Sequence, residues 1–259
     1  MKRGSGSLLL AVFSLATFFA CSDSHSGGFP TDAGPETGSI KADGGSTGDS
    51  GKTKKDSGDP TPVDEDSGTT TSCAPGSVSS FTPQWVPPAV LHANACSATQ
   101  ITTLLDCLFS STASQATCDA FNQAAANKSC ITCAVSQSTA ASLGPLVVSA
   151  DNLVSLNLAG CIARTSNQMT ATGCGAKVQA ASQCTGAACE ANCPVPDGDS
   201  QALKARNDCE TAAESSECQT YATDAKCADT LLQGASAPCA QGSTFEDVAK
   251  SLVTLFCGN

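Results

Sequence analysis

The feature that most constrains this chain is the parity of its cysteines. The chain has 17 cysteines in 259 residues. Exported proteins pair their cysteines in disulfides, so an odd number leaves one without a partner. All the cysteines except Cys21 lie between Cys73 and Cys257, and 17 − 1 = 16 is an even number. We therefore expect eight disulfides, and a different role for Cys21.

The segment before Cys21 is typical of a secretory signal peptide. Lys2 and Arg3 supply positive charge, and a 13-residue apolar stretch runs from Leu8 to Ala20. This stretch is shorter than the roughly 20 residues that a membrane-spanning helix needs. Ala20 directly before Cys21 resembles the lipobox of bacterial lipoproteins, in which a signal peptidase cuts ahead of a diacylated cysteine. We expect residues 1–20 to be a lipoprotein signal peptide and Cys21 to be lipidated, with ordinary cleavage nearby as the alternative.

Residues 21–72 are predicted to be the lipidated cysteine and a disordered acidic linker. The segment consists mainly of Ser, Gly, Asp, Thr, Pro and Lys, and Phe29 is its only aromatic residue. Such a composition buries too little apolar surface to offset the entropy of ordering. Ser22 occupies the position where, in the enterobacterial sorting rule, Asp retains a lipoprotein at the inner membrane. We expect an outer-membrane lipoprotein, facing the periplasm or the cell surface, with a flexible tether.

Residues 73–259 form the predicted cysteine-rich domain. It contains few large apolar residues, so disulfides must compensate for a thin core. Seven basic and fourteen acidic side chains give it a charge of 7 − 14 = −7. Nucleic acids and anionic lipid surfaces need a cationic face, so the charge argues against both as partners.

The periodicity of the domain is mainly helical. Capping boxes at Ser97 with Gln100, and at Ser243 with Glu246, each precede apolar residues at helical spacing. The Ala-rich segments 174–184, 199–215 and 217–233 are also predicted helices. In 145–161, β-branched runs flank the turn-like sequence "SADN", which predicts a short hairpin. The expected fold class is all-α, a disulfide-stapled helical domain with a small β-hairpin, preceded by a disordered tether.

The spacing of the cysteines predicts part of the connectivity. Helices from 97 to about 111 and from 114 to about 126 would form an antiparallel hairpin around a short turn. Cys107 and Cys118 lie equally far from this turn, so we expect them to pair. Cys96 is about three helical turns before Cys107 and would face Cys130, with Cys133 a close competitor. The cysteines without an assigned partner are Cys73, Cys133, Cys161, Cys174, Cys184, Cys189, Cys193, Cys209, Cys218, Cys227, Cys239 and Cys257.

Two cysteine patterns could carry chemistry other than structural disulfides. "CITC" at 130–133 has the spacing of a redox motif, but the thioredoxin-like context is absent. Cys174, Cys184, Cys189 and Cys193 could supply thiolates to zinc or an iron–sulfur cluster, but an oxidising compartment favours disulfides. We predict structural half-cystines in both places, with no metal and no cofactor.

No convergent catalytic set stands out among the remaining polar residues. Glu210, Glu214 and Glu217 share one helical face and could serve glycoside hydrolysis in a cleft, but a solvated acidic face is the expectation. His92 has no identifiable nucleophile beside it and is expected to pack or hydrogen-bond locally. Trp85 is expected to fill a groove between helices, with ligand contact by an exposed "WVPP" as the alternative. We therefore predict no catalytic residues.

The quoted features together resemble one group of proteins. The lipobox, the tether sequence "TDAGPETGS", and the segments "FTPQWVPPAVLHANACSATQI" and "LGPLVVSADNLVSLNLAGCIA" are similar to the uncharacterised Cys-rich lipoproteins of myxobacteria. The resemblance covers essentially the whole chain. It implies a membrane location and no particular activity.

Three functions follow as hypotheses. The first is a membrane-anchored, non-enzymatic interaction or structural module with an unknown protein or ligand as partner. The second is a carrier of a small apolar ligand, since elicitins are similarly disulfide-stapled helical proteins; an internal apolar cavity of several hundred Å³ would favour it. The third is a carboxylate-based hydrolase, which would need two carboxyl groups facing each other across a cleft.

Overall fold

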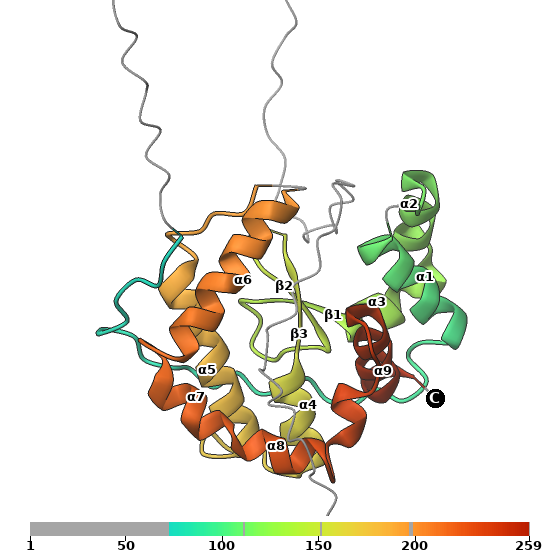
Figure 1. Cartoon of the computed structure of the whole chain (residues 1–259). Helices are drawn as coiled ribbons and strands as arrows, with labels where there is room; N and C mark the ends of the chain where they lie inside the picture. The colour runs from blue at the N-terminus through green and yellow to red at the C-terminus, as the bar shows by residue number, and fades with distance from the viewer. Residues whose placement is uncertain (1–72, 111, 151, 197–198, 259) are drawn as a thin grey trace, which may run out of the picture. The chain divides into compact units, whose positions relative to one another are not determined.

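The computed structural model describes residues 73–110, 112–150, 152–196 and 199–258. These residues are mostly helical, with one small sheet, as the sequence predicts (Figure 1). The predicted signal peptide 1–20, Cys21 and the linker 21–72 lie outside the described residues. Among the described helices, none combines the length and the apolar character needed to cross a membrane.

The three strands follow one another in the chain, between the helices α1 to α3 and the helices α4 to α9 (Figure 1). In chain order the elements are α1 Ala98–Phe109, α2 Gln115–Gln123, η1 Ala125–Asn127, α3 Lys128–Ala134, β1 Val135–Gln137, β2 Leu146–Val148, β3 Val154–Leu156, α4 Leu158–Thr165, α5 Cys174–Cys189, α6 Ser200–Glu214, α7 Gln219–Ala225, α8 Cys227–Leu232, η2 Ala237–Ala240 and α9 Phe245–Cys257.

One group of helices comprises α1, α2, α3 and α9. The capping box at Ser97 is present, with Gln100 accepting from the Ser97 amide at 2.8 Å. Helix α1 packs against α2, α3 and α9, and Phe109 meets Phe245 edge to face, with 5.0 Å between ring centroids. The predicted second helix, 114 to about 126, is shorter in the structure: α2 ends at Gln123, and the 3₁₀ turn η1 follows it. Helix α3, which comes next, was not predicted.

The capping box of α9 lies one residue later than the sequence prediction. Thr244, not Ser243, is the N-cap, and its side chain accepts from the Asp247 amide at 3.1 Å. Ser-x-x-Glu and Thr-x-x-Asp overlap here, and both satisfy the motif. The backbone N–H of Ser243, together with donors from Thr244, lowers the pKa of Asp247, since these donors favour its charged form.

The second group of helices, α4 to α8, is built around α5. Helix α5 contacts α4, α6, α7 and α8. Its approach to α4 depends on Gly175, where an added Cβ would lie 2.4 Å from the Ala159 carbonyl oxygen. The predicted helix over 217–233 is two helices, α7 and α8, which meet at Lys226.

The three-stranded sheet contains the predicted hairpin and one strand that was not predicted. Strands β2 and β3 pair antiparallel, and the hairpin turns at the expected place. Strand β1 pairs parallel to β2 at the open edge. The β1 sequence, "VSQ", follows directly after α3 and is too short to show a period of two.

Residues 73–96, which we call the N-terminal strap, cross both helical groups. At one end the Gly76 amide donates to the Ala188 carbonyl of α5 at 2.7 Å. At the other end the Cys96 amide donates to the Cys257 carbonyl of α9 at 2.8 Å. The strap therefore links α5 to α9.

All 16 cysteines from Cys73 to Cys257 are paired. Both pairs predicted from the spacing are present: Cys107–Cys118, with 5.5 Å between Cα atoms, and Cys96–Cys130, with 4.5 Å. Cys133, the competitor for Cys96, pairs with Cys257. The other pairs are Cys73–Cys193, Cys161–Cys239, Cys174–Cys227, Cys184–Cys218 and Cys189–Cys209.

We predict that the cost of removing a disulfide follows the length of the loop that it closes. The separation is 11 residues for Cys107–Cys118 and 124 for Cys133–Cys257. Because Cys161–Cys239 stays intact, Cys133–Cys257 closes an effective loop of (161 − 133) + (257 − 239) = 46 residues. Replacing both partners by Ser should therefore lower the free energy of unfolding by about 3 kcal/mol for the first pair and about 4 kcal/mol for the second. Urea unfolding under non-reducing conditions measures both. An equal or larger loss for the Cys107/Cys118 variant would contradict the loop-entropy explanation.

Candidate functional site

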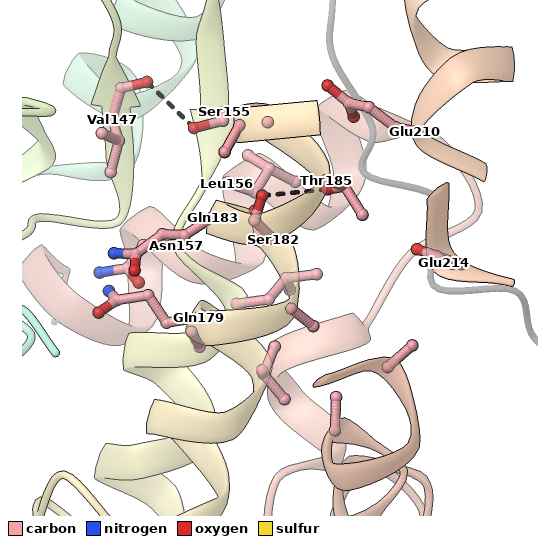
Figure 2. Close-up of a pocket in the computed structure, with 18 of the residues that line it drawn as sticks. Val147, Ser155, Leu156, Asn157, Gln179, Ser182, Gln183, Thr185, Glu210 and Glu214 are labelled. Carbon is pink, nitrogen blue, oxygen red and sulfur yellow. Dashed lines mark hydrogen bonds between the residues drawn. The ribbon is translucent and has the colours of Figure 1, made fainter. Parts of the chain in front are cut away.

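A groove of about 840 Å³ lies between the β2–β3 hairpin and helices α5, α6 and α7 (Figure 2). Its volume is within the range of about 300–1,000 Å³ that is usual for small-molecule sites. Apolar side chains line much of it: Val86, Leu143, Val147, Leu156, Leu158, Ala159, Val178, Ala181, Ala187, Ala222 and Ala225. The groove is open to solvent on one side, so it is not the internal cavity that would favour the ligand-carrier hypothesis, but it offers a concave, partly apolar surface of the right size for a small ligand.

Small residues of α5 leave room for the groove. Ala181, Ser182 and Gly186 lie along it, and an added Cβ at Gly186 would meet only the end of the Glu190 side chain, at 3.4 Å. The sequence shows α5 only as an Ala-rich helix pinned by cysteines. Only the folded structure, with α6, α7 and the hairpin around this face, shows that the small side chains leave a groove there.

Two glutamines hold α5 against the strap. Gln179 accepts from the Val86 amide at 2.7 Å and donates to the Val86 carbonyl at 3.2 Å. Gln183 makes the same pair of bonds with Gln84, at 2.9 and 2.8 Å. Each side-chain amide thus bonds both the N–H and the C=O of one strap residue, as a neighbouring β-strand would. These bonds fix Val86 at the edge of the groove.

Asn157, although it lines the groove, has a structural role. Its Oδ1 accepts from the Gly160 amide at 2.8 Å and caps α4. Its Nδ2 donates to the carbonyls of Leu143 and Gly144, both at 3.0 Å. These bonds join the start of α4 to the chain before β2, so Asn157 supports the groove wall.

Helix α6 supplies an acidic wall. Arg206, with 4% of its side chain exposed, places Nη2 3.0 Å from Glu190 Oε1 and Nε 3.5 Å from Glu210 Oε1. The Glu210 side chain is 3% exposed, whereas Glu217 is exposed beyond the end of the helix. The prediction of a solvated acidic face is therefore wrong for Glu210. The sequence does contain a sign of this burial. Arg206 lies one helical turn before Glu210, and its guanidinium compensates the buried carboxylate.

Glu214 lies one turn after Glu210 and also lines the groove (Figure 2). It is half-buried, and the described residues provide no ion pair for it. Desolvation raises the pKa of Glu214, and the nearby Glu210 carboxylate raises it further. Glu214 is thus a groove carboxylate whose ionised form is disfavoured in the unliganded protein.

The other residues singled out in the sequence lie in structural positions. His92 is exposed, and its backbone N–H donates to the Phe256 carbonyl at 2.8 Å. Trp85 is half-buried and donates from Nε1 to the Met169 carbonyl, at 3.2 Å, in the loop between α4 and α5. Neither side chain lines the groove.

The cysteine patterns that suggested redox or metal chemistry are parts of separate disulfides. Cys130 and Cys133 of "CITC" pair with different partners. The sulfurs of Cys73, Cys193 and Cys209 lie within 4.8 Å of one another, but they belong to two disulfides. The four candidate metal ligands beginning at Cys174 are likewise divided among four disulfides, so none of them is a thiolate.

Comparison with protein-family models gave no match, and comparisons with curated proteins and with solved structures gave none either.

We predict that Glu214→Gln stabilises the protein at neutral pH. The pKa of Glu214 in the folded state is raised above its ordinary value of 4.5. Below pH 4.5 the side chain is protonated in both the folded and the unfolded state, and its contribution to stability is fully present. This contribution is lost as the pH rises through the folded-state pKa. Urea unfolding should show Glu214→Gln more stable than the unchanged chain at neutral pH, and the difference should vanish below the ordinary pKa. Glu217→Gln, an exposed control outside the groove, should change little at either pH; an equal gain there would contradict the assignment.

Proposed function

We propose that this protein is an extracytoplasmic lipoprotein that binds a small, partly apolar ligand without transforming it. The observation that carries the proposal is the groove of about 840 Å³ beside α5. Val147 and Leu156 of the hairpin and Val178 of α5 offer apolar surface, and Ser155, Ser182 and Thr223 add hydrogen-bonding groups. This combination of an apolar lining and a few polar groups is typical of ligand sites.

The arrangement of carboxylates favours binding over hydrolysis. Hydrolysis of glycosides needs two carboxyl groups on opposite sides of the bond that breaks. Glu210 and Glu214 project from the same helix, one turn apart, and so belong to one wall of the groove (Figure 2). The other two carboxylates of the lining, Glu190 and Asp229, are exposed to solvent. Glu210 is also buried in an ion pair with Arg206, at 3.5 Å, so it is already engaged within the protein. We therefore propose a carrier or capture protein.

The proposed anchor is Cys21. It follows a positively charged start and an apolar stretch of 13 residues, with Ala20 directly before it. The eight disulfides support the proposal because they use all 16 other cysteines. Each methylene of an acyl chain contributes about 0.8 kcal/mol of membrane affinity, so two or more chains hold a protein durably. With Ser22 next to it, the proposed location is the outer membrane.

We predict that metabolic labelling with a palmitate analogue marks the protein in a bacterial host. Cys21→Ser should abolish the label and release the protein from the membrane fraction, since no acyl chain can then be attached. Ser22→Ala, which leaves the cysteine in place, should retain the label. A Cys21→Ser protein that is still labelled would contradict lipidation at this residue.

We predict that filling the groove abolishes binding of an apolar probe. The neutral dye N-phenyl-1-naphthylamine, which fluoresces in apolar surroundings, should bind the full chain carrying Cys21→Ser with a stoichiometry near one. Adding Ser182→Trp should weaken binding at least roughly tenfold, since the indole occupies part of the ligand volume. The matched control is Thr99→Trp, on an exposed position of α1 outside the groove. Equal effects of the two tryptophans, or no binding to the unfilled groove, would contradict the proposed function.

A further inference from the structure

We infer that the ligand of this groove is a cationic amphiphile, with an aliphatic body and a primary amine that pairs with Glu214. This inference rests on the proposed function and adds the chemical class of the ligand. It follows from the charges along the groove, from the position of Glu214 among them, and from the apolar surface facing it.

The lining of the groove has more carboxylates than cations. Glu190, Glu210, Glu214 and Asp229 contribute four negative charges when ionised, and Lys226 is the cation among the described lining residues. Arg206, behind the wall, contacts Glu190 and Glu210. Even with Arg206 counted beside Lys226, the net charge of these ionised side chains is 2 − 4 = −2. An anionic ligand, such as a carboxylate or a phosphate, would add like charge to this surface and is disfavoured.

Glu214 is the carboxylate best placed to receive a cation. Asp229 is exposed on α8, near Lys226, and Glu190 and Glu210 already contact Arg206. Glu214, in contrast, is half-buried, and no ion pair reaches it from the described residues. Placing a carboxylate there without a counter-ion is unfavourable, and a ligand ammonium would relieve that cost.

The apolar surface lies across the groove from this carboxylate. Figure 2 shows Glu210 and Glu214 on the α6 side, with Val147, Ser155 and Leu156 of the hairpin on another side. Residues of α5, including Ser182 and Thr185, lie between them. An aliphatic chain can therefore cover Leu156 and the small α5 residues while its amine reaches Glu214. A ligand with an alkyl body and a single ammonium group complements both surfaces.

The test compares three probes that share an alkyl chain, using the full chain with Cys21→Ser. Decylamine is protonated at neutral pH, since aliphatic amines resemble lysine with a pKa of about 10. Decanol is neutral and decanoate is negatively charged. Isothermal titration calorimetry below the micelle concentration should show decylamine binding roughly tenfold more tightly than decanol, the gain expected of a charge-assisted hydrogen bond. Decanoate should bind most weakly.

The decisive variant is Glu214→Gln, with Glu217→Gln as the matched control. Glu214→Gln should remove most of the tenfold preference for decylamine while leaving the affinity for decanol unchanged. Added salt should weaken decylamine binding to the unchanged groove and leave decanol binding unaffected, which gives a measurement independent of any variant. Glu217→Gln should retain the preference. The inference is overturned if decylamine binds no more tightly than decanol, or if both variants reduce the preference equally.

The result separates this inference from the proposed function. If decanol binds and Ser182→Trp blocks it, but decylamine shows no advantage, the groove is a ligand site and the cationic class is wrong. If none of the three probes binds, or if Ser182→Trp leaves their binding unchanged, both the proposed function and the inference are wrong.

Discussion

The covalent bonds between cysteine sulfurs are the constraint on which the rest of this structure depends. Cysteines occupy much of the buried interior. The fully buried members of one core cluster are five cysteines and two alanines, and the larger Val78, Phe81 and Tyr221 pack against it only partly buried. A core of that kind stabilises by surface burial far less than a Leu- or Phe-rich core does. The disulfides supply the missing stability mainly by restricting the unfolded chain. Long loops benefit most, and Cys73–Cys193 and Cys133–Cys257 join residues more than a hundred positions apart in the sequence.

The same bonds explain why the groove can stay open. Helix α5 is linked through Cys174, Cys184 and Cys189 to α8, to the residue before α7, and to α6. Because these bonds hold its neighbours, α5 does not need bulky residues on the face between the hairpin and α6. Ala181, Ser182 and Gly186 therefore leave volume that a conventionally packed domain would fill. The N-terminal strap completes the arrangement by holding α5 from another side, through Gln179 and Gln183.

The sequence predicts those parts of the fold that depend on local geometry. Cys107–Cys118 could be assigned because two helices and a short turn fix both residues, and the β2–β3 hairpin could be placed because "SADN" separates two β-branched runs. Cys73–Cys193 could not be assigned, since its partners are 120 residues apart and meet only after α5 and α6 have packed. The same limit applies to the groove. Its carboxylates were visible in the sequence as a helical row, but the burial of Glu210 depends on Arg206 and on the approach of α5.

A half-buried carboxylate without a counter-ion costs stability, and a thin core leaves little stability to lose. The disulfides offset this cost because they act on the unfolded state, whereas Glu214 acts on the folded one. The groove and its acidic wall consequently depend on oxidation of the cysteines that surround them, chiefly Cys184–Cys218 and Cys189–Cys209. A reducing compartment would remove the bonds that hold α6 and α7 beside α5, and with them the site. Export into an oxidising compartment, which the N-terminal sequence predicts, is then a physical requirement for the proposed ligand binding.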